Sequence, residues 1–103
     1  MEKTLNLSDV LDEIQRNKNV ILSFGVKNIG VFGSFVKNEQ KISSDLDILI
    51  EFKKGMKSFD NYMGLLFFLE DLFQVKIDLV IKEAIKPRLK SHILESVTYA
   101  KGL

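Results

Sequence analysis

Three aspartates occupy positions where side-chain packing alone would not place a carboxylate. Asp45 and Asp47 stand at the start of one apolar run, and Asp78 lies inside another. Aspartate is disfavoured in strands, and a buried carboxylate without a partner is costly. Because alternate residues of a strand point to one face, Asp45 and Asp47 should project together, with Asp78 beside them if the two strands are neighbours. Such a cluster repels itself unless a cation compensates it, so the pattern predicts an oxygen-ligand metal site, best suited to Mg²⁺.

A glycine–serine pair provides the second chemical signal. Gly33 and Ser34 follow a short apolar run directly and open a polar segment. Glycine allows backbone N–H groups to approach a phosphate closely, and the serine hydroxyl adds a further donor. Each signal alone has a purely structural interpretation, in which Asp45 caps a turn and Asp78 pairs with Lys76. Taken together, the pair and the three aspartates favour a metal-dependent phosphate chemistry.

The composition excludes several other kinds of protein. The chain has 103 residues, which fits one domain over residues 1–103, and it has no cysteine. Disulfides, thiolate zinc sites and cysteine nucleophiles are therefore excluded, and a cytoplasmic location is expected. Fifteen basic and fourteen acidic residues give no overall electrostatic case for direct nucleic-acid binding. No apolar run approaches the ~20 residues of a membrane helix, so we expect no membrane association.

The hydrophobic pattern predicts an α+β fold, a small mixed β-sheet with helices packed on it. One helix, or two short ones, should begin at Ser8 as N-cap and stop at Gly25. Residues 35–44 are expected to form a turn with a short helix. The remaining predicted elements are strands at 28–32, 46–52 and 75–81, a helix from Ser58 to Phe73, and a last helix from Pro87 whose Leu89, Ile93, Leu94 and Val97 face the core.

The spacing of these residues resembles a known signature. Gly33-Ser34, ten intervening residues and Asp45-Leu46-Asp47 resemble the Gly-Ser-x10-Asp-x-Asp motif of the DNA polymerase β-like nucleotidyltransferases. Residues 31–35 and 44–52 are most similar to the minimal nucleotidyltransferases, the MNT antitoxins of HEPN/MNT toxin–antitoxin pairs. Residues 76–80 resemble that family's third acidic strand, and residues 86–94 resemble its closing helix. The resemblance covers nearly the whole chain and implies the nucleotidyltransferase fold.

The resemblance also implies an activity and a partner. Asp45, Asp47 and Asp78 would be catalytic and would hold two Mg²⁺ ions, while Gly33 and Ser34 would bind the phosphates of ATP. AMP would then be transferred to a hydroxyl, with tyrosine as the expected acceptor, on a HEPN ribonuclease toxin. This AMPylation would silence the toxin, and the chain would act as its antitoxin within a hetero-oligomer.

One stretch departs from the family pattern and keeps alternatives open. Where relatives usually carry Ala-Arg-Gly-Glu, this chain has Val36-Lys37-Asn38-Glu39. Lys37 keeps the charge but lacks the planar two-pronged donor of arginine. A non-catalytic antitoxin that neutralises by binding is therefore one alternative, and a small-molecule nucleotidyltransferase is another. Aromatic residues that could contact a partner, or equally belong to the core, are Phe59, Tyr62, Phe67, Phe68 and Tyr99.

Overall fold

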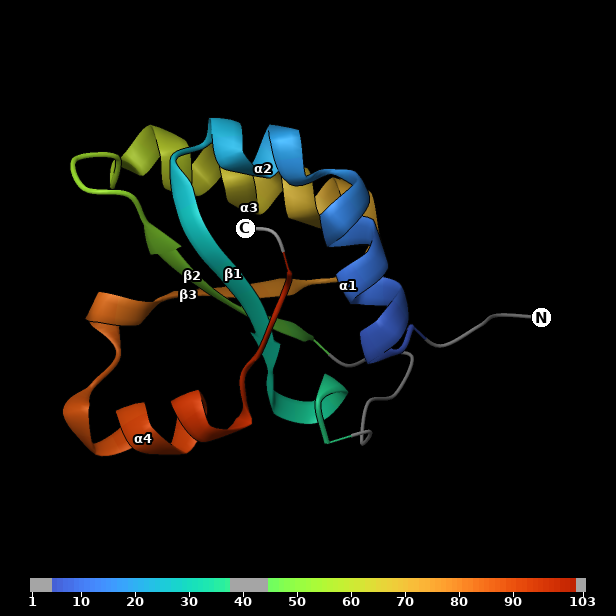
Figure 1. The fold of residues 1–103 in the computed structure, drawn as a ribbon, viewed down its shortest axis with the longest axis vertical. Coiled ribbons are helices and arrows are strands. Elements are labelled where there is room, and N and C mark those ends of the chain that lie inside the picture. Colours follow the sequence, from blue (N-terminus) through green and yellow to red (C-terminus); the bar gives the residue numbers. More distant parts are fainter. Residues whose placement is uncertain (1–4, 38–44, 102–103) are drawn as a thin grey trace.

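The computed structural model of the protein describes residues 5–37 and 45–101. It confirms the predicted α+β class, with four strands and helices on them (Figure 1). The elements are α1 (Leu7–Arg16), α2 (Lys18–Ser23), β1 (Val26–Phe32), the 3-10 turn η1 (Gly33–Phe35), β2 (Leu46–Phe52), α3 (Phe59–Phe73), β3 (Ile77–Ile81), the 3-10 turn η2 (Lys82–Ala84), α4 (Pro87–Ser96) and β4 (Thr98–Tyr99).

The sheet is mixed, with the strand order β3-β2-β1-β4. β1 runs antiparallel to both β2 and β4, whereas β2 and β3 are parallel. A parallel pair needs a crossover connection, and α3 supplies it. Because β2 and β3 run in the same direction, both strands begin at the same edge of the sheet, next to the end of β1.

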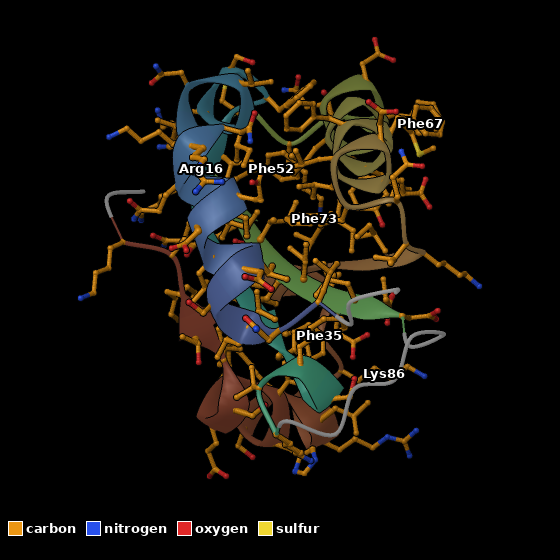
Figure 2. All side chains as sticks on the ribbon, turned by 90° about the vertical axis from the view of Figure 1, so that its right-hand side faces the viewer. Arg16, Phe35, Phe52, Phe67, Phe73 and Lys86 are labelled. Carbon is orange, nitrogen blue, oxygen red and sulfur yellow. The ribbon has the colours of Figure 1, made fainter. Side chains whose placement is uncertain are left out.

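The two faces of the sheet differ in character. α1, α2 and α3 cover one face, and α4 lies on the opposite side (Figure 1). In Figure 2, Phe35, Phe52 and Phe73 lie inside the molecule, whereas Phe67 points outward from α3. The alternation in β2 matches the prediction, because Leu46, Ile48, Ile50 and Phe52 are buried in the core and Asp47 and Glu51 point to the other face. The face opposite the core therefore carries the carboxylates.

Helix caps explain most element boundaries. α1 begins two residues earlier than a Ser8 cap would give, because the Asn6 side chain accepts a hydrogen bond from Asp9 N at 2.9 Å, so the Ser8 prediction was wrong. Asparagine caps as well as serine does, and spacing alone does not choose between them. The Ser58 cap is confirmed, since its hydroxyl accepts from Asn61 N at 3.1 Å. Gly25, with φ of +84°, follows the end of α2 as predicted.

The C-terminal elements differ from the prediction. Leu89 is exposed, and Ile93, Leu94 and Val97 are half-buried and lie outside the main core, so the prediction that these residues face the core was wrong. The sheet face on its side carries Asp47 and Glu51 beside the buried Phe32 and Leu49, and it is separate from the main core on the other face. α4 leads into β4, a two-residue strand too short to predict from sequence.

Two further findings concern segments named above. Of the expected turn at 35–44, the structure has η1 at Gly33–Phe35, and residues 38–44 lie outside the described residues. Among the helices that are described, none has the length and apolar character to span a membrane.

Candidate active site

Asp47 and Asp78 occupy the same level of the parallel strand pair. They are register partners near the starts of β2 and β3, and both lie on the sheet face opposite the core. Asp47 is half-buried and Asp78 is exposed. Two residues 31 positions apart in the sequence are thus brought side by side by the parallel register.

The electrostatics of Asp47 reflect this pairing. Burial raises the pKa of the Asp47 carboxyl to about 6, and the charge of Asp78 is the next largest cause. A hydrogen bond with the Asp78 side chain and the charge of Asp45 raise the pKa of Asp47 further. Two carboxylates can share a hydrogen bond only when one of them carries a proton. When both are ionised, the pair is repulsive unless a cation lies beside it.

Asp45 lies at the margin of this pair. It is exposed and precedes β2, and its charge is the smallest of the causes acting on Asp47. Across residues 5–37 and 45–101, no group of three or more acidic, histidine or cysteine side chains has the arrangement of a metal site. Within the same residues, none of the three aspartates forms an ion pair with Lys, Arg or His. The structure therefore joins Asp47 to Asp78 and leaves Asp45 within electrostatic range.

Gly33 sits directly against the Asp47 carboxylate. Its φ is +77°, a left-handed conformation that favours glycine, and Phe32 is the register partner of Asp47. A Cβ on residue 33 would lie 2.1 Å from Asp47 Oδ2. Both the backbone and the available space therefore require glycine here. The Gly33 carbonyl accepts from the backbone N–H groups of Val36 and Lys37, at 3.1 and 3.2 Å, which fixes the bend that carries half-buried Ser34.

The same combination of features is found in a known family. The family described as "Nucleotidyltransferase domain" matches residues 7–100 of this chain. The chain belongs to the nucleotidyltransferase family. The match spans every element that positions the Gly33 bend and the aspartates.

Individual relatives of this nucleotidyltransferase carry names of the same class of enzyme. Protein adenylyltransferase MntA of Thermococcus cleftensis is 41% identical over 76 residues, covering 74% of this chain and 76% of MntA. A solved structure assigned as a minimal nucleotidyltransferase superposes with a TM-score of 0.80 at 26% identity, covering 94% of this chain and 98% of that one. A complex of a tri-AMPylated Shewanella oneidensis HEPN toxin with an MNT antitoxin contains a chain that matches at 19% identity and a TM-score of 0.57. That match covers 86% of this chain and 72% of the other, and it shows a shared fold.

Tyr62 is a residue near the site whose role the sequence did not indicate. Its hydroxyl, on α3, donates to the Leu79 carbonyl of β3 at 2.7 Å. Burial raises the pKa of Tyr62, and the charge of neighbouring Asp78 raises it further. The sequence suggested only a core or partner-contact role, because nothing in the spacing places α3 against the strand that carries Asp78.

The donor set of this nucleotidyltransferase fits a hard divalent cation. Carboxylate oxygens are the ligands that Mg²⁺ prefers, and burial together with the charge of Asp78 raises the pKa of Asp47. A cation at the Asp47–Asp78 pair would remove that repulsion. At the adjacent bend, the backbone of Gly33 lies directly beside the Asp47 carboxylate, with no side chain between them.

Proposed function

We propose that this chain is a protein adenylyltransferase that transfers AMP from ATP to a tyrosine hydroxyl of a HEPN-type toxin and so acts as its antitoxin. The observation that carries the proposal is the juxtaposition of Asp47 and Asp78 beside the Gly33 bend. The name of the 41%-identical relative, a protein adenylyltransferase, supports the reaction class. The AMPylated HEPN toxin bound to an MNT antitoxin of the same fold supports the acceptor and the partner.

The proposed reaction is an in-line substitution at the α-phosphorus of ATP. The acceptor oxygen forms a bond to the α-phosphorus, the bond from that phosphorus to the β-phosphate oxygen breaks, and pyrophosphate leaves. The proton of the acceptor hydroxyl goes to a carboxylate, for which exposed Asp78 is our candidate. Gly33 and Ser34 would bind the outer phosphates through backbone N–H groups and the serine hydroxyl.

Asp45, Asp47 and Asp78 are the proposed Mg²⁺ ligands. Bound Mg²⁺ would offset the charge of the triphosphate and stabilise the attacking and leaving oxygens. In this proposal residues 1–103 act as one minimal nucleotidyltransferase domain, and the partner supplies the acceptor hydroxyl in a hetero-oligomer. We expect Asp45 to join the other two aspartates when triphosphate is bound, because its exposed side chain is free to turn toward them.

A second candidate is a non-catalytic antitoxin that neutralises the toxin by binding alone. The observation that favours it is Lys37, which stands where relatives usually carry arginine and which is exposed in the structure. A lysine there cannot make the two parallel hydrogen bonds of a guanidinium to phosphate or carboxylate.

One experiment separates the two candidates. The protein is incubated with α-³²P-ATP, Mg²⁺ and the purified toxin encoded beside it, and label on the toxin is measured with toxin activity. We expect toxin labelling that falls about 100-fold or more in Asp78→Asn, because that change removes a carboxylate from the reacting site. Glu51→Gln is the matched control, since it neutralises a carboxylate on the same sheet face at the other end of β2. Full neutralisation without label would support the binding candidate and overturn the enzymatic one.

A further inference from the structure

β3, the strand that carries Asp78, lies at the edge of the sheet. The strand order β3-β2-β1-β4 places β2 between two strands, whereas β3 has β2 as its only strand neighbour among the described residues. Asp47 is therefore held by hydrogen-bonded strands on both sides, and Asp78 by a strand on one side. An edge strand leaves half of its backbone N–H and C=O groups without a partner strand. The position of Asp78 relative to Asp47 thus depends on what fixes the outer side of β3.

Tyr62 contacts this outer side one residue after Asp78. The Lys76 carbonyl accepts from the N–H of Leu46 in β2 at 2.9 Å, so the backbone of Lys76 faces β2. Successive residues of a strand direct their backbone groups alternately to the two sides, so Asp78 also faces β2 and the Leu79 carbonyl faces outward. The Tyr62 hydroxyl donates to this outward carbonyl at 2.7 Å. At this one carbonyl, Tyr62 supplies the hydrogen bond that a further strand would otherwise supply.

Both sides of the contact are anchored. Tyr62 lies in the first turn of α3, where its N–H donates to the carbonyl of the capping residue Ser58 at 2.9 Å. The Leu79 side chain is buried in the core, and Tyr62 packs against the same core. The charge of Asp78 acts on the pKa of Tyr62, so the hydroxyl lies within electrostatic range of that carboxylate. The hydrogen bond therefore joins the capped start of α3 to the residue that follows Asp78.

We propose that Tyr62 is a positioning residue, whose hydrogen bond to the Leu79 carbonyl holds the edge strand β3 so that the Asp78 carboxylate stays beside Asp47. The inference rests on the proposed function, in which Asp78 accepts the proton of the acceptor hydroxyl. Tyr62 itself touches neither the nucleotide nor the acceptor and acts only through Asp78. Because a displacement of about 1 Å at a reacting group can cost as much as 100-fold in rate, loss of this contact should lower kcat.

Tyr62→Phe removes the hydroxyl and keeps the ring. In the toxin-labelling assay we expect kcat to fall about 10-fold and the KM for ATP to stay within about 2-fold, at a temperature where unfolding curves show the variant to be folded. Tyr99→Phe is the matched control, because it removes a tyrosine hydroxyl that has no hydrogen-bond partner among the described residues, and it should keep its kcat. A role limited to stability would lower the unfolding midpoint of Tyr62→Phe and leave kcat unchanged, which would overturn the proposal.

The Asp78→Asn background tests whether Tyr62 acts through Asp78. Once the carboxylate is absent, its position no longer matters, so adding Tyr62→Phe to Asp78→Asn should lower kcat by no more than about 2-fold. A further fall of about 10-fold in the double variant would show that Tyr62 affects the reaction by another route, and the proposal would be wrong.

Amide hydrogen exchange tests the contact without the reaction. The N–H of Asp78 faces β2, and by the same alternation the N–H of Leu49 in β2 faces β1. Tyr62→Phe should speed exchange at Asp78 about 10-fold and leave exchange at Leu49 unchanged, because only the edge strand is loosened. Unchanged exchange at Asp78, or equal acceleration at both amides, would contradict the proposal. If the unmodified protein does not label the toxin, the proposed function fails, and exchange at Asp78 still decides whether Tyr62 holds β3.

Discussion

Two carboxylates on β2 share a strand and a sheet face but have opposite surroundings. Glu51 accepts a hydrogen bond from Asn28 Nδ2 at 3.1 Å, and Lys82 Nζ and Lys27 Nζ lie 3.9 and 4.0 Å from its oxygens. Asp47, four residues earlier on the same face, meets the Asp78 carboxylate and the charge of Asp45 instead. One end of the strand is neutralised by its neighbours, whereas the other accumulates negative charge.

The contrast distinguishes Glu51, a carboxylate paired with cations of the fold, from Asp47, a carboxylate available to bind a cationic ligand. Packing a half-buried carboxylate beside a cation is the ordinary solution, and β2 uses it at Glu51. At Asp47 burial and then the charge of Asp78 raise the pKa of the carboxyl to about 6, with no cation among the described residues to offset them. Perturbed carboxylates of this kind concentrate at functional sites, because the repulsion is relieved when a cationic ligand binds.

The largest effect is expected from Gly33→Ala. The new Cβ would lie 2.1 Å from Asp47 Oδ2, so the carboxylate must move away from the bend. We expect toxin labelling to fall about 100-fold or more, together with a loss of about 1–2 kcal/mol in unfolding free energy from the left-handed backbone.

Gly55→Ala is the matched control for that change. Gly55 has a φ of +80°, close to that of Gly33, but nothing lies within 4 Å of its added Cβ. It should lose similar stability and keep its activity. Equal activity in both variants would show that the contact between residue 33 and Asp47 does not matter.

An intermediate effect is expected from Asp47→Asn on stability. The folded-state pKa of about 6 exceeds the ordinary value of 3.8, so the folded protein binds this proton more tightly than the unfolded chain. Stability therefore falls as pH rises through that window, and the full cost is present above it. In EDTA, Asp47→Asn should raise the unfolding free energy by about 1–2 kcal/mol above pH 6, after allowance for solvent screening, and by nothing below pH 3.8.

Denaturant unfolding across this pH range measures the effect, and Mg²⁺ sharpens it. Added Mg²⁺ should raise the unfolding midpoint of the unmodified protein above pH 6 and have little effect on Asp47→Asn. A variant less stable than the unmodified protein in EDTA above pH 6 would contradict the assignment of Asp47 as an uncompensated charge.

The smallest effect is expected from Glu51→Gln. Its two lysine contacts are long and partly exposed, so their loss should cost about 0.5 kcal/mol, and less at high salt. Lys27→Gln removes the more exposed of the two lysine partners and should lower the unfolding free energy by no more than Glu51→Gln does. Urea unfolding at low and high ionic strength measures both. A loss above about 2 kcal/mol would show that the two ends of β2 do not differ as described.

Much of the fold follows from local patterns. Strand alternation in residues 46–52, the Ser58 cap and the Pro87 helix start were all predicted correctly, because each depends on residues within a few positions of one another. The error at Ser8 arose between two nearby capping residues, Asn6 and Ser8. The α4 prediction failed because an amphipathic pattern does not reveal which face of the sheet the helix will pack on or how completely it will be covered there.

The order of residues along the chain was sufficient to indicate which groups carry the chemistry. Gly33, Ser34 and the Asp45–Asp47 pair lie close together in sequence, and their spacing reflects a local bend and strand. The tertiary structure alone decided that Asp78 lies beside Asp47, that Lys82 neutralises Glu51, and that the Tyr62 hydroxyl reaches the Leu79 carbonyl. These contacts join segments far apart along the chain, and strand order and register, which residue spacing does not encode, determine them.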